Sequence, residues 1–200
     1  MPFSRVYLEI TNCCNLACSF CPGTTRRAAF LTVAQFTHLA GALRGQTRFL
    51  YFHVMGEPLL HPDLPELLDI AGRMGFRVVL TTNGTLLPKR QRELLAAQAL
   101  HKVSVSLHSF EANSGVDMEH YLAGCTDFGL AASEAGILID YRLWNLDGAE
   151  TRGRNEQNDA ILNHLHAAYP GNCVAMLMAR WVLQRTTRHL PAGMVSARIW

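Results

Sequence analysis

The sequence predicts an α/β fold in which parallel strands alternate with helices and close part of a barrel. Short buried runs of apolar residues recur along the chain, and each is followed by a stretch with helical periodicity. This alternation is typical of a parallel sheet with right-handed crossovers. The ends of successive predicted strands carry unusual residues, namely Cys14, Glu57, Asn83, His108 and Asn145, and this is the edge where barrel sites are built. This placement favours a barrel over an open, doubly wound sheet, which would also fit the alternation.

Five strand–helix units can be followed in order. The predicted strands cover 6–11, 49–54, 76–81, 103–107 and 137–144. The predicted helices cover 32–43, 64–74, 89–97, 118–135 and 159–168, with Thr32 and Asp63 as N-caps. A sixth strand would have to lie at 174–178 or 181–184. We therefore expect a TIM-like partial (β/α)6 barrel over residues 1–171, and a C-terminal tail over 172–200.

Length and composition favour one well-buried domain. The 200 residues are 49% apolar and 17% charged, and the formal net charge of +2 gives no reason to expect a nucleic-acid partner. Neither a signal peptide nor a run of about eighteen apolar residues is present, so no membrane association is expected. Thiolates kept for a metal need a reducing compartment, which predicts the cytoplasm. Histidines such as His61 and His120 are expected at the surface or on a helix face.

Four of the six cysteines lie within the short segment that follows the first predicted strand. Cys14, Cys18 and Cys21 have the spacing CxxxCxxC and supply three thiolates. A structural zinc ion normally takes four protein ligands, whereas a cubic iron–sulfur cluster with three thiolates leaves one iron open to a reactant. Cys13 is expected to be a bystander, because adjacent residues rarely turn toward the same centre. The alternatives are a zinc site and an ordinary electron-transfer cluster.

The segment CNLACSFC at 14–21 resembles the cluster motif of the radical S-adenosylmethionine (SAM) superfamily. The resemblance implies a [4Fe-4S] cluster whose open iron chelates the amino and carboxylate groups of SAM. One electron would then split the sulfonium into methionine and a 5′-deoxyadenosyl radical. It also implies an electron donor such as a flavodoxin or ferredoxin, and a fold of six βα units.

Two later motifs agree with this resemblance. The tripeptide Gly56-Glu57-Pro58 resembles the family's GEP motif, whose backbone and side chain cradle the methionine amino group. A glycine allows close approach of the backbone, and a carbonyl or carboxylate accepts hydrogen bonds from an amine. Taken alone, the tripeptide is an ordinary turn sequence. Asn83 lies in a Thr-Asn-Gly turn that many members carry, although it equally fits a simple Asn-Gly turn.

Three further residues are candidates for cofactor contacts. Ser106 and His108 are expected to be alternate residues of the fourth strand that point to one side of the sheet. In relatives such positions contact the ribose and carboxylate of the cofactor, although a satisfied core polar group is the alternative. Arg142 is flanked by apolar strand residues and needs an acceptor if it is buried. That acceptor is either the methionine carboxylate or an ion pair with Glu9 or Glu57.

These features predict a radical SAM enzyme, with a non-catalytic iron–sulfur or zinc-binding protein on a degenerate barrel as the alternative. Segments 52–68 and 104–110 resemble bacterial members that usually carry a C-terminal, SPASM-type extension with additional cysteines. That resemblance favours a peptide or protein substrate. The tail at 172–200 could supply the sixth strand and a closing helix, belong to a longer enzyme, or diverge through a frame change or truncation. No residue is identified as a general acid or base.

Overall fold

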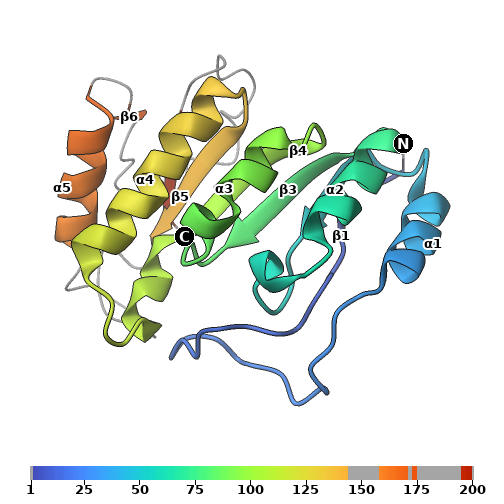
Figure 1. Cartoon of the computed structure of the whole chain (residues 1–200), viewed down its shortest axis with the longest axis horizontal. Coiled ribbons are helices and arrows are strands. Elements are labelled where there is room, and N and C mark those ends of the chain that lie inside the picture. The colour runs from blue at the N-terminus through green and yellow to red at the C-terminus, as the bar shows by residue number, and fades with distance from the viewer. Residues whose placement is uncertain (1, 144–157, 171–172, 175–194, 200) are drawn as a thin grey trace.

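The computed structural model describes residues 2–143, 158–170, 173–174 and 195–199 (Figure 1). The strands of these residues form one parallel sheet in the order β1-β2-β3-β4-β5-β7-β6. The strands are β1 (Val6–Tyr7), β2 (Phe49–Phe52), β3 (Arg77–Thr82), β4 (Leu100–Ser106), β5 (Leu138–Leu143), β6 (Cys173–Val174) and β7 (Val195–Ile199). The helices are α1 (Val33–Leu43), α2 (Leu64–Arg73), α3 (Leu87–Ala96), α4 (Met118–Glu134) and α5 (Asn158–Ala168), with 3-10 helices η1 (Pro58–Leu60) and η2 (Leu107–Ala112).

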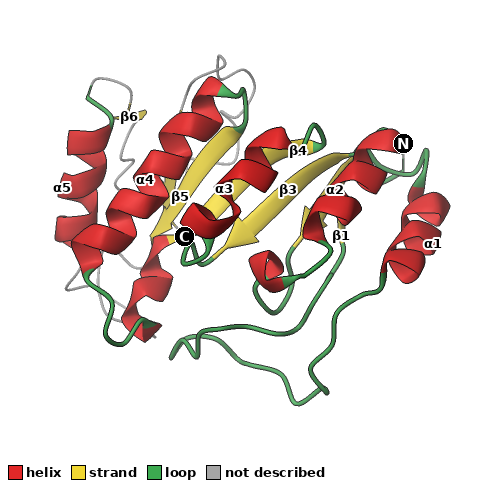
Figure 2. Cartoon of the chain, in the orientation of Figure 1, coloured by secondary structure: helices red, strands yellow, loops and turns green. Residues whose placement is uncertain are grey.

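The order of the strands identifies the type of sheet. From β1 to β5, each strand pairs with the next one along the chain, and the direction never reverses. A doubly wound sheet reverses its order beside the first strand, so this arrangement excludes it. Since parallel crossovers are almost always right-handed, an unbroken order places the connecting helices on one face. Figure 2 shows the helices in front of the strands, and the parallel α/β prediction is confirmed.

The core lies between this helical layer and the sheet. Strand β2 shows the pattern: Leu50 and Phe52 are fully buried, whereas Phe49 and Tyr51 are half-buried on the other face. The Phe52 ring meets the ring of Phe36 from α1 edge-on at 5.5 Å between centroids. Burying a side chain of this kind contributes roughly 1.5–3 kcal/mol. The helix-facing side of the sheet therefore holds the layers together, and the opposite face of β2 carries the half-buried aromatic rings of Phe49 and Tyr51.

The helix caps agree with the sequence in one case and differ in another. Thr32 forms the predicted cap of α1, because its hydroxyl accepts from the Gln35 N–H while the Gln35 side chain accepts from the Thr32 N–H. The Asp63 side chain makes no such bond, and the Asp63 N–H donates to Nδ1 of His61. The prediction that His61 is at the surface or on a helix face is wrong. It is fully buried, and its Nε2 donates to the Leu31 carbonyl at 2.9 Å, so both ring nitrogens are satisfied.

Several element boundaries also differ from the prediction. Strand β1 ends at Tyr7 because residues 10–12 turn away from the sheet and lie antiparallel to residues 29–31. In this pairing Leu31 N donates to Ile10 O at 2.8 Å. His108 lies in η2 rather than in the fourth strand. The sheet is extended by β6 and by β7, which pairs with β5. The alternative strand at 181–184 lies outside the described residues.

Candidate functional site

The four clustered cysteines lie on a long connection between β1 and α1, residues 12–30, which we call the cysteine loop. In Figure 1 the blue loop crosses the lower part of the view, on the side toward which the arrowheads of β3 and β5 point. Its base is closed by side chains of residues 11 and 12. Thr11 Oγ1 donates to Ala29 O at 2.9 Å, and Asn12 Oδ1 accepts from Ala29 N at 2.7 Å. The loop is therefore fixed at its base, at the carboxyl edge of the sheet.

The thiols of Cys14, Cys18 and Cys21 lie within electrostatic reach of one another. Burial raises the pKa of the Cys18 thiol to about 11, opposed by a hydrogen bond with Ser109, and negative charge on Cys14 and Cys21 adds to the rise. Burial likewise raises the pKa of the Cys14 thiol, and Cys21 contributes again. The three cysteines thus lie close enough to influence one another, and burial keeps the thiols of Cys14 and Cys18 protonated at neutral pH. Binding of an inorganic centre has to displace those protons.

Cys13 faces a different neighbourhood from the other three. Its Sγ lies 3.8 Å from Ala29 O and 4.0 Å from Asn12 Oδ1, against the base of the loop. Across the described residues, no three His, Cys, Asp or Glu side chains are arranged to hold a single metal ion. A cluster binds each thiolate through a separate iron, so its ligands need not meet at one point. Three thiolates on Cys14, Cys18 and Cys21 suit this kind of ligation, one to each of three irons.

Gly56 brings the end of β2 into direct contact with the cysteine loop. Its φ of 76° is in the left-handed region, and an added Cβ would lie 2.6 Å from Thr11 O and 2.7 Å from Cys13 O. Real Cβ contacts are never this short, so only glycine fits. The next residue completes the junction, because Glu57 N donates to Cys13 O at 2.7 Å. The close approach predicted for this glycine is thus made to the protein's own backbone.

The Glu57 carboxylate is turned into the protein and is only 2% exposed. Oε1 accepts from Leu59 N at 3.0 Å and from Thr82 Oγ1 at 2.8 Å, and Oε2 accepts from Asn83 N at 2.7 Å. Burial raises the pKa of this carboxyl to about 7 against the effect of these three hydrogen bonds. The side chain therefore joins β2 to β3, and Pro58 begins η1 beside it. The carbonyls of Glu57 and Pro58 accept from the N–H groups of Leu60 and His61, each at 3.0 Å.

Asn83 contacts two residues of the cysteine loop, Cys14 and Asn15. Its Nδ2 donates to Asn15 Oδ1 at 2.9 Å and lies 4.0 Å from the Cys14 Sγ. Its Oδ1 accepts from both the backbone N–H and the hydroxyl of Thr85, and the hydroxyl of Tyr121 donates to its carbonyl at 2.7 Å. The side chain is therefore committed to protein partners, and it links the end of β3 to the loop.

The structure brings Ser106, His108 and Arg142 together. Ser106 and Arg142 are register partners on β4 and β5. His108 is not an alternate strand residue, as predicted, but its Nδ1 donates to Arg142 O at 3.1 Å from η2. Burial lowers the pKa of His108 to about 4, and the Arg142 charge contributes to this shift. The pKa of His53 is lowered too, mainly by burial and then by the charge of Arg142. No sequence pattern identified His53 as a residue near this site.

The two carboxylates proposed as protein partners of Arg142 have other partners. Glu9 forms an ion pair with Arg26 at 2.6 Å and accepts from Met55 N at 3.2 Å. Glu57 is engaged by the donors at the end of β3. The position Asn145, also expected at this edge, lies outside the described residues. These contacts account for both carboxylates without Arg142.

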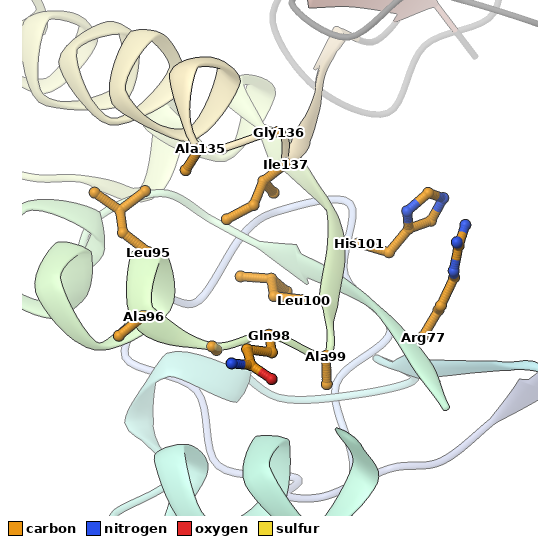
Figure 3. A pocket seen from close by; sticks show the side chains of 11 residues that line it. Arg77, Leu95, Ala96, Gln98, Ala99, Leu100, His101, Ala135, Gly136 and Ile137 are labelled. Carbon is orange, nitrogen blue, oxygen red and sulfur yellow. The ribbon is translucent and has the colours of Figure 1, made fainter. Parts of the chain in front are cut away.

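A hollow of about 480 Å³ lies at the other end of the sheet, where β3, β4 and β5 begin. Figure 3 shows Arg77 and His101 on one side of it, with Leu95 and Ala96 across from them. No cysteine lines it. The amino end of a barrel sheet usually serves stability rather than chemistry, so this hollow is separate from the cysteine site.

Comparison with known proteins identifies the family. Residues 8–124 match the Radical SAM superfamily, which is more than half of the chain. The chain belongs to this superfamily of enzymes, which use a [4Fe-4S] cluster and S-adenosylmethionine. This agrees with the CxxxCxxC spacing of Cys14, Cys18 and Cys21 on the loop at the carboxyl edge of the sheet. None of the helices in the described parts of the chain is both long and apolar enough to cross a bilayer.

Individual relatives differ in what they act on. A tungsten-containing aldehyde ferredoxin oxidoreductase cofactor-modifying protein of Pyrococcus furiosus is 30% identical over 68% of this chain and 38% of its own length. A PqqA peptide cyclase of Streptomyces rochei is 34% identical over 54% of this chain and 30% of its own. The chain thus spans about a third of these relatives.

A solved structure shows the same fold. Streptococcus suis SuiB bound to S-adenosylmethionine superposes with a TM-score of 0.62 and 18% identity, over 84% of this chain and 39% of its own. SuiB bound to the precursor peptide SuiA matches equally well. With the family and the unbroken strand order, this likeness confirms the predicted partial barrel.

Proposed function

We propose that the cysteine loop binds a [4Fe-4S] cluster through Cys14, Cys18 and Cys21 and that the chain reductively cleaves S-adenosylmethionine. The observation that carries this proposal is the mutual approach of these three thiols at the carboxyl edge of the sheet. Cys13 is directed toward Ala29 and takes no part. Three protein ligands leave one corner of a cubic cluster open to a reactant.

When bound, the cluster delivers one electron to the SAM sulfonium, which splits into methionine and a 5′-deoxyadenosyl radical. The protein's own groups bind and orient the cofactor. We propose that backbone acceptors of Gly56, Glu57 and Pro58 take the methionine amine, and that Arg142 takes its carboxylate. Ser106 and a neutral His108 flank Arg142 and can hydrogen-bond the remaining polar groups of SAM. Asn83, the remaining residue predicted to contact the cofactor, keeps Cys14 in place.

We further propose that an acidic flavodoxin or ferredoxin supplies the electron. Cys14 and Cys21 are exposed, so a cluster held there lies close to the surface. Arg26 and Arg27 on the same loop are exposed and offer positive charge to such a donor. Free thiols at the surface persist in a reducing compartment, which supports the cytoplasm as the site of action.

Anaerobic reconstitution tests cluster binding. We expect about four irons and four sulfides per chain, and an electron paramagnetic resonance (EPR) signal of the reduced cluster that changes when SAM is added. Stoichiometric zinc with no response to SAM would instead support a non-catalytic metal protein. An iron–sulfur signal that SAM leaves unchanged would indicate an ordinary electron-transfer cluster.

The substrate class that we propose is a peptide or protein. Support comes from relatives named as a peptide cyclase and as a protein bound to a precursor peptide. The P. furiosus relative, named for modifying a cofactor, is the contrasting case. The test offers perdeuterated peptides or perdeuterated nucleotides to the loaded enzyme and measures deuterium in 5′-deoxyadenosine. Deuterium from peptides supports the proposal, and deuterium from nucleotides alone overturns it.

A further inference from the structure

The second half of the cysteine loop is held by a residue to which no motif assigns a role. Oε1 of Glu111, in η2, accepts from the Ser19 N–H at 2.9 Å and from the Ser19 hydroxyl at 2.7 Å. Ser19 directly follows Cys18 and precedes Cys21 by two positions. A carboxylate that accepts two donors of one residue fixes its backbone as well as its side chain.

Two neighbours of Glu111 on η2 contact the adjacent loop residues. Ser109 hydrogen-bonds the thiol of Cys18, and the His108 ring meets the Phe20 ring edge-on at 4.8 Å between centroids. Cys21 N in turn donates to Cys18 O at 3.1 Å, so both cysteines follow the position of this short segment. Residues 18–20 of the cysteine loop therefore all contact η2.

The 3-10 helix is itself rigidly placed. His108 is bonded to the backbone of β5, and Phe110 is buried against the ring of Tyr121 from α4 at 5.2 Å. The first half of the loop has a separate attachment, in which Asn15 bonds Asn83 and Thr85. Glu111 therefore holds the part of the loop around Ser19, and the ion pair of Arg26 with Glu9 holds a later part.

We propose that Glu111 is a positioning residue for the cluster. It holds Cys18 and Cys21 in place through Ser19, and its negative charge lowers the reduction potential of the bound cluster. The first role concerns the chain without cofactors. The second rests on the proposed function, because net charge close to a cluster is one of the factors that set its potential.

Two substitutions separate these roles. Glu111→Gln keeps an oxygen that accepts both Ser19 bonds and removes only the charge, whereas Glu111→Ala removes both. Ser19→Ala deletes one bond without touching η2, which keeps the test valid if Glu111→Ala does not fold. Glu134→Ala is the matched control, since Glu134 is an exposed glutamate at the end of α4.

The loop role is tested on the apo-protein by alkylation, with mass spectrometry of each cysteine. Glu111→Ala should speed modification of Cys18 and Cys21 by about fivefold, as expected for the loss of two partly exposed charge-assisted bonds. Ser19→Ala should give a smaller increase, and Glu134→Ala should match the wild type. Glu111→Gln removes a charge that raises the pKa of the Cys18 thiol, so it should speed modification of Cys18 but not of Cys21. Unchanged rates in both Glu111→Ala and Ser19→Ala would overturn this role.

The charge role is tested by redox titration of the loaded protein. Glu111→Gln should raise the midpoint potential at unchanged iron content, and Glu134→Ala should not. An unaltered potential in Glu111→Gln overturns the charge role. If the wild type binds no cluster, the charge role falls with the proposed function, and the alkylation rates still decide the loop role.

Discussion

The backbone N–H of Glu57 donates a 2.7 Å hydrogen bond to the carbonyl of Cys13. This bond joins the end of β2 to the first turn of the cysteine loop, one residue before the first cluster cysteine. Because the Glu57 carboxylate also binds Thr82 and Asn83, one residue connects β2, β3 and the loop. The geometry of the cysteine site is therefore set by the sheet rather than by the loop alone.

Gly56→Ala should destabilise the apo-protein more than another glycine substitution at positive φ. Gly75 has a φ of 84° with open space around its Cβ position, so Gly75→Ala should cost about 1 kcal/mol in the free energy of unfolding. At Gly56 the new methyl also overlaps the backbone of the loop, so the loss should reach about 3 kcal/mol. Chemical denaturation measures both. Equal losses would show that the loop moves aside at little cost.

Glu57→Gln should remove a component of the pH dependence of stability. Because burial raises the pKa of this carboxyl from 4.5 to about 7, the folded state binds its proton more tightly than the unfolded state. The resulting stabilisation is complete below pH 4.5 and is lost as the pH rises through 7. The wild type should therefore lose about 2–3 kcal/mol between pH 5 and 8 relative to the variant.

The comparison with Glu57→Gln is needed because His53 and His108 have the opposite effect. Burial lowers the pKa of each ring, so they bind protons more tightly in the unfolded state and favour folding as the pH rises. The difference between the two denaturation curves isolates Glu57. Glu66→Gln, an exposed carboxylate of α2, is the control. Parallel curves for wild type and Glu57→Gln would contradict the buried-carboxyl account.

Single alanine substitutions should divide the four clustered cysteines into two groups. Replacement of Cys14, Cys18 or Cys21 should abolish cluster binding, because each removes one of three thiolates. Cys13→Ala should retain the cluster, since its sulfur faces Ala29. Iron and sulfide content after reconstitution decides. If Cys13→Ala alone lost its metal, the ligand assignment would be wrong.

Arg142→Gln should weaken SAM binding by about tenfold while leaving the iron content unchanged, because a charge-assisted bond to a carboxylate is lost. Arg142→Lys keeps the positive charge but lacks the planar guanidinium group. Its affinity for SAM should therefore lie between those of the wild type and Arg142→Gln. Titration of the SAM-induced change in the EPR signal measures this affinity. Wild-type affinity in Arg142→Gln would assign the SAM carboxylate to another partner.

The sequence predicts the repeating architecture because helix periodicity, caps and apolar strands are local patterns. Thr32 with Gln35 caps α1 as expected, and the alternation of strands and helices gives the parallel sheet. The early end of β1 depends on pairing of 10–12 with 29–31, which no local pattern encodes. Burial of His61 likewise depends on the carbonyl of Leu31, 30 positions away.

The same distinction applies to the site. Cysteine spacing predicts the candidate ligands, because three thiolates in one loop already limit the possible centres. The supporting contacts are distant in sequence: Glu57 meets Asn83 across 26 positions, and Ser19 meets Glu111 across 92. The GEP motif predicts that the side chain of Glu57 contacts the cofactor. In the fold, the Glu57 carboxylate instead accepts hydrogen bonds from the end of β3. Glu111 carries no signal of its own in the sequence.

Production of 5′-deoxyadenosine is the measurement that tests the central claim most directly, because it needs no knowledge of the substrate. The reconstituted protein, incubated anaerobically with SAM and dithionite, should release 5′-deoxyadenosine and methionine in equal amounts, and Cys18→Ala should release neither. Absence of 5′-deoxyadenosine from a wild-type protein that carries its full complement of iron and sulfide would contradict the claim that this site cleaves SAM.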